Sequence, residues 1–364
     1  MNRTHSAVLA LVLIFLFLPL KLVCQSSHCA FSWFGYIDRT GTFVVKPQFD
    51  MAYSFHEGLA AIENCNGSAG YIDHSGKQIF TSGDAADFSE GLARVGLVKP
   101  TSSIVEGQGQ PNLPSGRYGF IDKQGNLVID ATWLIADHFS DGLANVGSVG
   151  KQGYVDKSGK VVIPNTLYMA YDFNDGLARV AVERKDGSGS ETWGYINKKG
   201  QFVIHPRYED AGDFSEGLAS VKMNGKWGYI DETGRMVIQP RFDEAWEFRE
   251  EVGRVVQNGM CGYIKKGGEF AVKPQPEFFI CGDFHEGLAS VEREKAGYID
   301  KSGNYVIKPV FDKAEDFSEG LAFAALGETR GYIDKNGEFV FTGQFINAWE
   351  FSEGLAAVSV DKEP

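Results

Sequence analysis

Short stretches of alternating apolar and polar residues, separated by glycine-containing turns, recur along most of the chain. In the unit around Gly228, an Asn-Gly pair joins the first two stretches, because both residues tolerate positive φ in a tight hairpin. A turn ending in Gly234 leads to a third stretch, which Pro240 is expected to end because proline has no N–H for a strand ladder. The strands predicted for this unit are Leu218–Met223, Lys226–Asp231 and residues 235–239.

The unit occurs nine times, and its most regular landmark is a glycine followed by an aromatic residue. Most steps between these glycines are 34 or 35 residues, and a fixed period of this length is typical of repeat proteins. Residues that recur at one phase should build the scaffold, so binding chemistry is expected where the pattern breaks. The landmark residues are Gly35, Gly70, Gly119, Gly153, Gly194, Gly228, Gly262, Gly297 and Gly331.

Each unit is predicted to be a three-stranded antiparallel meander, followed by a connector of about a dozen residues. The high Phe and Tyr content favours sheet over helix. One phenylalanine recurs in every connector and is expected to pack between neighbouring units. These residues are Phe55, Phe88, Phe139, Phe173, Phe214, Phe248, Phe284, Phe317 and Phe351.

The repeat array over residues 30–360 predicts an all-β protein, stacked as a curved open solenoid. The open form is favoured because propellers usually have four to eight blades of four strands. The alternative is a closed propeller-like ring. The chain begins with the second and third strands of a unit and ends with a first strand at 355–360, so its two ends could pair.

The spacing, the Trp-Gly-Tyr-Ile phrases at Trp193 and Trp227, and the repeated Phe-Ser-Glu-Gly-Leu-Ala phrase resemble the WG-repeat family, whose members are mostly bacterial. The resemblance covers about nine tenths of the chain through its nine phased copies. Only two copies keep the tryptophan, so the resemblance assigns that residue no role here. It implies a β-rich repeat array that serves interaction and carries over no catalytic residues.

Residues 1–24 are predicted to be a signal peptide, because Arg3 precedes an apolar run at 7–20 that is followed by polar residues. The run is shorter than the roughly 20 residues that span a bilayer, so no stable membrane span is expected after leader cleavage. The protein is therefore expected to be exported, to the periplasm, the outer surface or the medium. Residues 22–24 resemble a bacterial lipobox, which makes Cys24 a candidate for lipidation, although Val23 departs from the small residue normal at that position.

Four other cysteines fall at interpretable places in the repeat. Cys29 and Cys65 precede the landmark glycines of successive units by nearly equal distances, whereas Cys261 and Cys281 are expected to lie within one repeat. Export permits disulfides, so we predict the pairs Cys29–Cys65 and Cys261–Cys281. The alternative is that all four are buried free thiols.

An acidic residue recurs directly before the glycine of the Phe-Ser-Glu-Gly phrase. It is expected either to accept a backbone N–H at its turn, or to form a stripe that binds cations or a basic partner. Residues 249–252 interrupt this column with two consecutive glutamates. The members of the predicted column are Glu57, Glu90, Asp141, Asp175, Glu216, Glu286, Glu319 and Glu353.

Two insertions, at 99–116 and 183–191, lengthen the period. Both replace the first hairpin turn of a unit and should project from the same edge of the array. Long loops on a rigid scaffold often carry binding sites. The alternative is that these polar segments are flexible inserts without a role.

The formal net charge of −13 argues against a nucleic-acid partner, which would need clustered Lys and Arg. The chain has no Gly-x-Ser-x-Gly elbow and no phosphate-binding Gly-Lys loop. His56 and His285 each begin a His-Glu-Gly phrase, but neither has the second histidine four residues later that a zinc helix requires. No catalytic residue, cofactor or metal is therefore predicted.

We expect an exported, non-enzymatic scaffold that binds a so far unidentified protein partner at or outside the cell envelope. A carbohydrate or cell-wall binding module is the alternative, if Trp133, Trp246 or Trp349 faces solvent in a groove. A third hypothesis is an enzyme with an unrecognised site, at the insertions or at Glu250 and Glu251.

Overall fold

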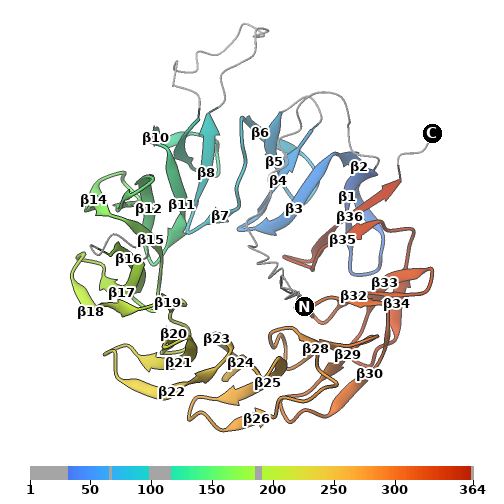
Figure 1. Ribbon diagram of the computed structural model, residues 1–364. Helices are drawn as coiled ribbons and strands as arrows, with labels where there is room; N and C mark the ends of the chain where they lie inside the picture. Colours follow the sequence, from blue (N-terminus) through green and yellow to red (C-terminus); the bar gives the residue numbers. More distant parts are fainter. Residues whose placement is uncertain (1–31, 65–67, 98–115, 185–190, 362–364) are drawn as a thin grey trace, which may run out of the picture.

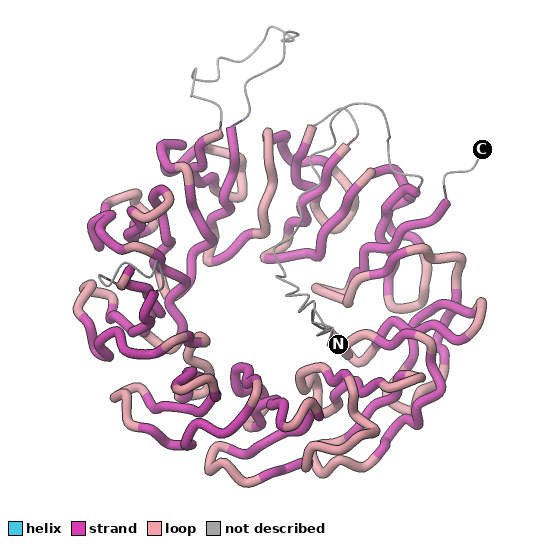
Figure 2. The backbone as a smooth tube through the Cα atoms, in the orientation of Figure 1, coloured by secondary structure: helices cyan, strands magenta, loops and turns pink. Residues whose placement is uncertain are grey.

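The computed structural model describes residues 32–64, 68–97, 116–184 and 191–361. These residues form β-strands and loops without a helix, which confirms the all-β prediction (Figure 2). The described residues accordingly contain no helix long and apolar enough to cross a membrane. The strands make nine four-stranded antiparallel sheets, which surround one axis as blades of a ring (Figure 1).

The four strands of a blade run from the axis outward (Figure 1). We number the blades 1 to 9 in the order of their innermost strands. The innermost strands are β3 (Met51–His56), β7 (Phe88–Ser89), β11 (Ile135–Ser140), β15 (Met169–Asn174), β19 (Asp210–Ala211), β23 (Glu244–Arg249), β27 (Ile280–Cys281), β31 (Lys313–Ala314) and β35 (Asn347–Ala348). The second strands are β4 (Leu59–Glu63), β8 (Leu92–Leu97), β12 (Leu143–Ser148), β16 (Leu177–Glu183), β20 (Leu218–Met223), β24 (Val252–Gln257), β28 (Ala289–Glu292), β32 (Ala322–Leu326) and β36 (Leu355–Asp361).

The third and fourth strands complete each blade in the same order. The third strands are β5 (Ala69–Ile72), β9 (Arg117–Ile121), β13 (Lys151–Asp156), β17 (Glu191–Asn197), β21 (Lys226–Asp231), β25 (Met260–Lys265), β29 (Ala296–Ile299), β33 (Thr329–Ile333) and β1 (Ser32–Asp38). The outermost strands are β6 (Gln78–Ser82), β10 (Leu127–Trp133), β14 (Val161–Leu167), β18 (Phe202–Tyr208), β22 (Met236–Phe242), β26 (Phe270–Val272), β30 (Tyr305–Phe311), β34 (Phe339–Thr342) and β2 (Phe43–Phe49).

The predicted open solenoid is wrong, and the closed ring is the correct alternative. Blade 9 is built from both ends of the chain, in the order β2-β1-β36-β35. Strand β1 pairs with β36 over seven residues, from Ser32 opposite Asp361 to Asp38 opposite Leu355. An open array would leave the edges of these two strands without hydrogen-bond partners. In the closed ring the β1–β36 ladder pairs them.

Each unit has four strands, not the predicted three, because the connector supplies the innermost strand. In blade 1, Ala52 pairs with Ile62 and Phe55 with Ala60, so the register shifts between them. This β-bulge places the buried Ala52 and Phe55 three positions apart, which hides the two-residue period of a strand. The alternation in the sequence therefore predicts a connector rather than a strand.

Pro240 lies inside the outermost strand β22 and does not end it, which corrects the sequence prediction. An outermost strand has one free edge, where a residue without an N–H is tolerated. The register shifts between the Trp227–Phe242 and Tyr229–Ile238 pairs, so the chain bulges around this proline. A Cβ on the landmark residue Gly228 would lie 2.4 Å from the Ile238 carbonyl oxygen, so only glycine lets the bulge approach.

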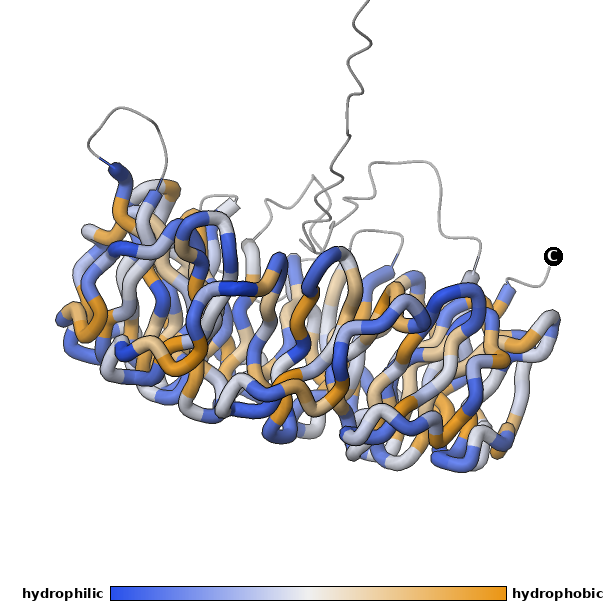
Figure 3. The backbone as a smooth tube through the Cα atoms, turned by 60° about the horizontal axis from the view of Figure 1, so that its bottom comes forward, coloured by the Kyte–Doolittle hydropathy of each residue, from blue (hydrophilic) through white to orange (hydrophobic). Residues whose placement is uncertain are grey.

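The connector phenylalanines pack between blades, as predicted. Phe214 in blade 5 lies 4.8 Å from the ring of Tyr195 in blade 4, in a T-shaped pair, and both side chains are buried. The Tyr195 hydroxyl also donates to the Gly212 carbonyl, 2.7 Å away. An equivalent aromatic pair, 4.8–5.1 Å between centroids, occupies each of the nine junctions, and it packs in an apolar cluster that spans two blades. Seen obliquely, apolar segments alternate with polar ones along the blades nearest the viewer (Figure 3).

Removing β36 should open the ring. We expect deletion of residues 353–364 to abolish the compact distance distribution in small-angle scattering and to lower the melting temperature by at least about 10 °C, because β1 loses its seven-residue ladder and blade 9 its core. Deletion of residues 362–364, beyond the end of β36, is the control. A truncated chain with the scattering curve of the parent would contradict closure through β1 and β36.

Candidate functional site

The acidic column predicted from the sequence lies at the turns between the first and second strands of the blades. In blade 1, His56 pairs with Leu59, and Glu57 and Gly58 both have positive φ, 54° and 90°. This is a two-residue hairpin turn of type I′. Left-handed backbone is unfavourable for glutamate, so the side chain must contribute something that compensates.

That contribution is a hydrogen bond to the next blade. The Gly91 N–H of blade 2 donates to the Glu57 carboxylate, with a nitrogen-to-oxygen distance of 3.0 Å. The same contact occurs at all nine junctions, at 2.8–3.1 Å, and Glu353 closes the circle by accepting the Gly58 N–H. The sequence predicted an N–H bond within each turn, whereas the structure places the donor in the following blade.

The apparent break in the column is filled. Glu250 accepts the Gly287 N–H at 3.0 Å and pairs with Lys301, while Glu251 takes the place of the turn glycine and donates its own N–H to Glu216. Seven of the nine carboxylates have a basic partner from the next blade within 4 Å. These contacts make the column part of the scaffold. A binding role for it stays a prediction.

The inner end of the blades carries a second acidic column that the sequence analysis missed. It is formed by the residue directly before each connector phenylalanine, on or beside the innermost strands, and seven of its nine members are carboxylates. The signal was available, because the residue recurs at one phase of the repeat. We call these nine residues the inner rim: Ser54, Asp87, His138, Asp172, Asp213, Glu247, Asp283, Asp316 and Glu350.

Burial and neighbouring charges set the ionisation of the inner rim. Burial raises the pKa of Asp172 to about 6, although His138, 3.3 Å away, opposes the shift. Burial likewise raises the pKa of Asp213, and Arg179 opposes this at 2.8 Å. Burial also raises the pKa of Asp316, opposed by His285. Carboxylates that are costly to ionise and lie on or beside the innermost strands of the ring are candidates for binding a cation.

The remaining predicted residues divide between the described and undescribed parts of the chain. Cys261 on β25 and Cys281 on β27 form the predicted pair, with Cα atoms 6.4 Å apart, and tie blade 6 to blade 7. Cys24, Cys29, Cys65, the 1–24 leader and nearly all of both insertions lie outside the described residues. Within the described residues, no group of three or more His, Cys, Asp or Glu side chains could hold a metal ion.

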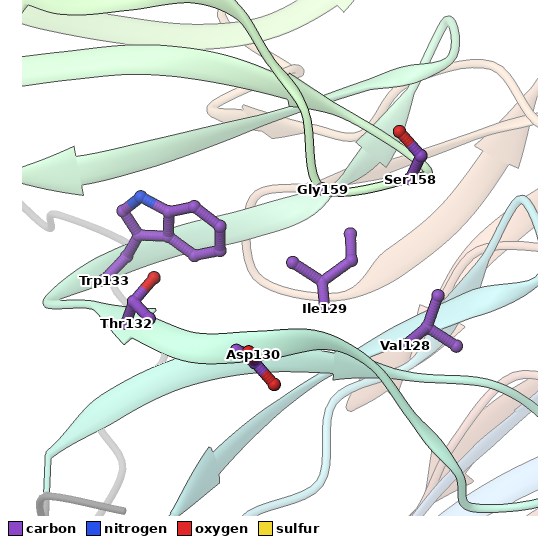
Figure 4. A pocket seen from close by; sticks show the side chains of 7 residues that line it. All are labelled: Val128, Ile129, Asp130, Thr132, Trp133, Ser158 and Gly159. Atoms are coloured by element: carbon purple, nitrogen blue, oxygen red, sulfur yellow. The ribbon is translucent and has the colours of Figure 1, made fainter.

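The tryptophans that bear on carbohydrate binding differ in their surroundings. Trp349 is 39% exposed, but its indole N–H donates to the Ala52 carbonyl. Trp246 is half-buried beneath the Arg254 guanidinium, 4.0 Å from the ring centroid. Trp133 is half-buried at the end of β10 and lines an open depression of about 340 Å³ with Val128, Thr132 and Ser158 of the neighbouring blade's turn (Figure 4).

A ring of nine four-stranded blades around one axis defines a β-propeller. The model of the family described as "WG containing repeat" matches eight segments that together make up more than half of the chain, and the protein belongs to this family. The repeat at 262–296 lies between the matched segments. The segments are 34–67, 70–97, 118–147, 153–185, 193–227, 227–261, 297–328 and 331–363.

Comparison with solved structures bears on the fold alone. No curated protein sequence matches the chain. A solved structure described as "Crystal structure of the eukaryotic initiation factor" is similar with a TM-score of 0.61 and 12% identity, over 92% of this chain and 98% of that one. BamB from Moraxella catarrhalis is similar with a TM-score of 0.46 and 9% identity, over 85% of this chain and 96% of that one. At 12% identity, the first likeness shows the fold alone.

Loss of one carboxylate in the turn column should destabilise the ring modestly. We expect Glu57→Gln to lower the free energy of unfolding by about 1 kcal/mol at low salt, because the hydrogen bond to Gly91 loses its charge and the ion pair with Lys123 is lost. The loss should be smaller at high salt, because the Glu57 side chain is one third exposed and its charge is screened. Burial works against ionisation, but Lys123 and the Gly91 N–H hold the pKa of Glu57 below its usual value. The contribution should therefore be full above the unfolded pKa and be lost as the pH falls through the folded one. A Glu57→Gln variant as stable as the parent in both salts would refute the role.

The inner rim should show the opposite dependence on pH. Because the pKa of Asp172 is raised, its proton-linked stabilisation is full below the unfolded pKa of about 3.8 and is lost as the pH rises through about 6. Asp172→Asn should therefore be more stable than the parent at pH 7.5, with the difference shrinking towards pH 4, in thermal melts. Asp130→Asn, which removes an exposed carboxylate of β10, is the control. An advantage of Asp172→Asn that is independent of pH would exclude this account.

Proposed function

We propose that this protein is an exported, non-enzymatic scaffold that binds a basic protein partner at the inner rim. The observation that carries the proposal is that seven blades each place a carboxylate residue on or beside their innermost strand, and these strands surround a single axis (Figure 1). Inter-blade hydrogen bonds at every junction hold these side chains on a rigid frame. A pre-organised acidic surface of this kind attracts and orients a cationic partner.

Export is supported by the predicted leader and by the cysteine pair. The Cys261–Cys281 pair joins neighbouring blades, and such a bond persists in an oxidising compartment. The proposal is compatible with either a free or a lipid-anchored protein, the latter through Cys24.

Cross-linking in cells, followed by mass spectrometry of the purified protein, tests the partner and its location. A rim variant and a control variant each remove three negative charges, and a third variant lacks residues 99–116. The rim variant is Asp87→Asn with Asp316→Asn and Glu350→Gln, and the control is Asp130→Asn with Glu232→Gln and Glu338→Gln. We expect a partner that the parent and the control capture and the rim variant loses at least tenfold.

Two other outcomes would redirect the assignment. A partner lost only from the variant without residues 99–116 would place binding on that insertion. Carbohydrate binding is the second candidate, because Trp133 lines the open depression beside β10 (Figure 4). Carbohydrate binding would be supported if cell-wall oligosaccharides quench the tryptophan fluorescence, if Trp133→Ala abolishes the quenching, and if the parent captures no protein.

A further inference from the structure

The turn between the third and fourth strands of a blade is closed by the side chain that ends the third strand. In blade 5 this residue is Asp231, whose Oδ1 accepts the backbone N–H groups of Thr233 and Arg235 at 3.1 and 3.0 Å. N–H groups that point inward from such a turn form a concave binding place for an anion, called a nest. The nest of blade 5 therefore holds a carboxylate from its own turn.

Eight of the nine blades fill this nest in the same way. In each, one side-chain oxygen accepts two N–H groups of its own turn at 2.8–3.1 Å. Seven of the acceptors are aspartates and one is an asparagine, so the nest accepts a carboxylate or an amide oxygen. The acceptors are Asp38, Asp73, Asp122, Asp156, Asn197, Asp231, Asp300 and Asp334.

Blade 6 has the same turn, between β25 and β26, without the acceptor (Figure 1). Lys265 ends β25 at the place where the other blades have aspartate or asparagine. The backbone of the turn is nevertheless kept. The Lys265 N–H donates to the Glu269 carbonyl and the Gly268 N–H to the Lys265 carbonyl, both at 2.8 Å, and Gly268 has the positive φ of 91° that the turn requires.

Two exposed N–H groups of this turn are left without an acceptor. They belong to Gly267 and Glu269, which correspond to Thr233 and Arg235 in blade 5, and no described residue accepts either of them. The Glu269 carboxylate lies beside the turn, since a Cβ on Gly267 would be 2.5 Å from its Oε2, but it makes no hydrogen bond with these N–H groups. The nest of blade 6 is thus preformed and open to solvent.

The nest faces a depression of about 500 Å³, which is lined by Lys265, Lys266, Lys301, Glu250, Glu251 and Glu269. Lys266 pairs with Glu216 at 3.1 Å, and Lys301 pairs with Glu250 at 3.0 Å. Lys265 is exposed and has no ion-pair partner among the described residues. An unpaired ammonium and two N–H groups without acceptors therefore lie at one depression, and both favour a negatively charged group.

A second departure from the repeat lines the same depression. Glu251 has a φ of 71° at the place where the other eight blades have glycine in the turn between their first two strands. Left-handed backbone is costly for a residue with a side chain, and it persists mostly at functional positions. Two positions at which blade 6 breaks the pattern of the ring thus coincide in space.

We propose that the depression of blade 6 binds an external carboxylate group, which accepts the Gly267 and Glu269 N–H groups and pairs with Lys265. The ring itself shows what the nest accepts, because side-chain oxygens fill it in the other eight blades. Lys265 adds the charge that favours a carboxylate over a neutral amide. The inference goes beyond the proposed function and does not depend on it, because β25 and β26 lie at the edge of the blade opposite the inner rim.

A carboxylate fits this depression better than a phosphate group. Three glutamates line the depression and would repel a doubly charged group more strongly than a singly charged one. In proteins a single carboxylate of this kind belongs either to the end of a chain or to an acidic side chain. The test therefore includes both forms.

Binding is tested by amide NMR of the ¹⁵N-labelled, purified full-length protein at constant ionic strength. The probes are Nα-acetyl-alanine, which has a terminal carboxylate, and Nα-acetyl-aspartate amide, which has a side-chain carboxylate. We expect saturable downfield shifts of the Gly267 and Glu269 amide protons, because a carboxylate oxygen becomes their acceptor. The neutral Nα-acetyl-alanine amide should bind at least tenfold more weakly. The carboxylate probe that binds more tightly identifies the source of the group.

Two variants of Lys265 remove the same charge and differ by one methylene. Lys265→Asn should fill the nest as Asn197 does in blade 4, so the two amide protons should shift without any probe and no longer respond to one. Lys265→Gln is the matched control, because its longer side chain does not place the amide oxygen in the nest. It should bind the carboxylate probes more weakly than the parent but at least fivefold more tightly than Lys265→Asn.

Three results would overturn the site. The first is equal binding of the charged and neutral probes, and the second is the same response in the two Lys265 variants. The third is a Gly267 amide proton that moves when the pH is lowered without a probe, if Glu269→Gln abolishes the movement. In that case Glu269 would itself fill the nest.

Discussion

Closure of the ring is the constraint on which the rest of this structure depends. The two ends of the chain share blade 9, and the seven-residue ladder between β1 and β36 closes the nine blades into a circle. Once the circle is closed, every blade has a neighbour on both sides. The turn carboxylates can then form an unbroken circle of hydrogen bonds, from Glu57 and Gly91 round to Glu353 and Gly58. An open array would leave one such pair unmade, the one between Glu353 and Gly58 at its two ends.

The two acidic columns differ in how fully their charges are compensated. The turn column combines unfavourable left-handed backbone with an inter-blade bond, so its carboxylates are held by N–H donors and lysines. The inner rim has burial without full compensation, as the raised pKa of Asp172 shows. Buried charges that weaken a fold are commonly retained for function. That physical difference is why we assign binding to the inner rim.

A repeat protein supplies its own internal comparison. The third residue of the second strand differs between blades, and at four junctions it is long or polar enough to reach a backbone carbonyl of the next blade. Arg94, Arg179 and Arg254 each donate to a backbone carbonyl of the next blade, and Asn145 donates to the Ala170 carbonyl in the same way.

The sequence by itself determined the nine units, the hairpin strands and the connector phenylalanines, because turn chemistry and apolar phase are local and repeat nine times. It did not reveal the fourth strand, because the bulge between Ala52 and Phe55 disrupts the two-residue period. Only the tertiary structure decided that the array closes, since closure depends on small blade-to-blade rotations summed round the ring. It also decided which donor each turn carboxylate meets, because these partners come from different blades and meet only when the blades pack.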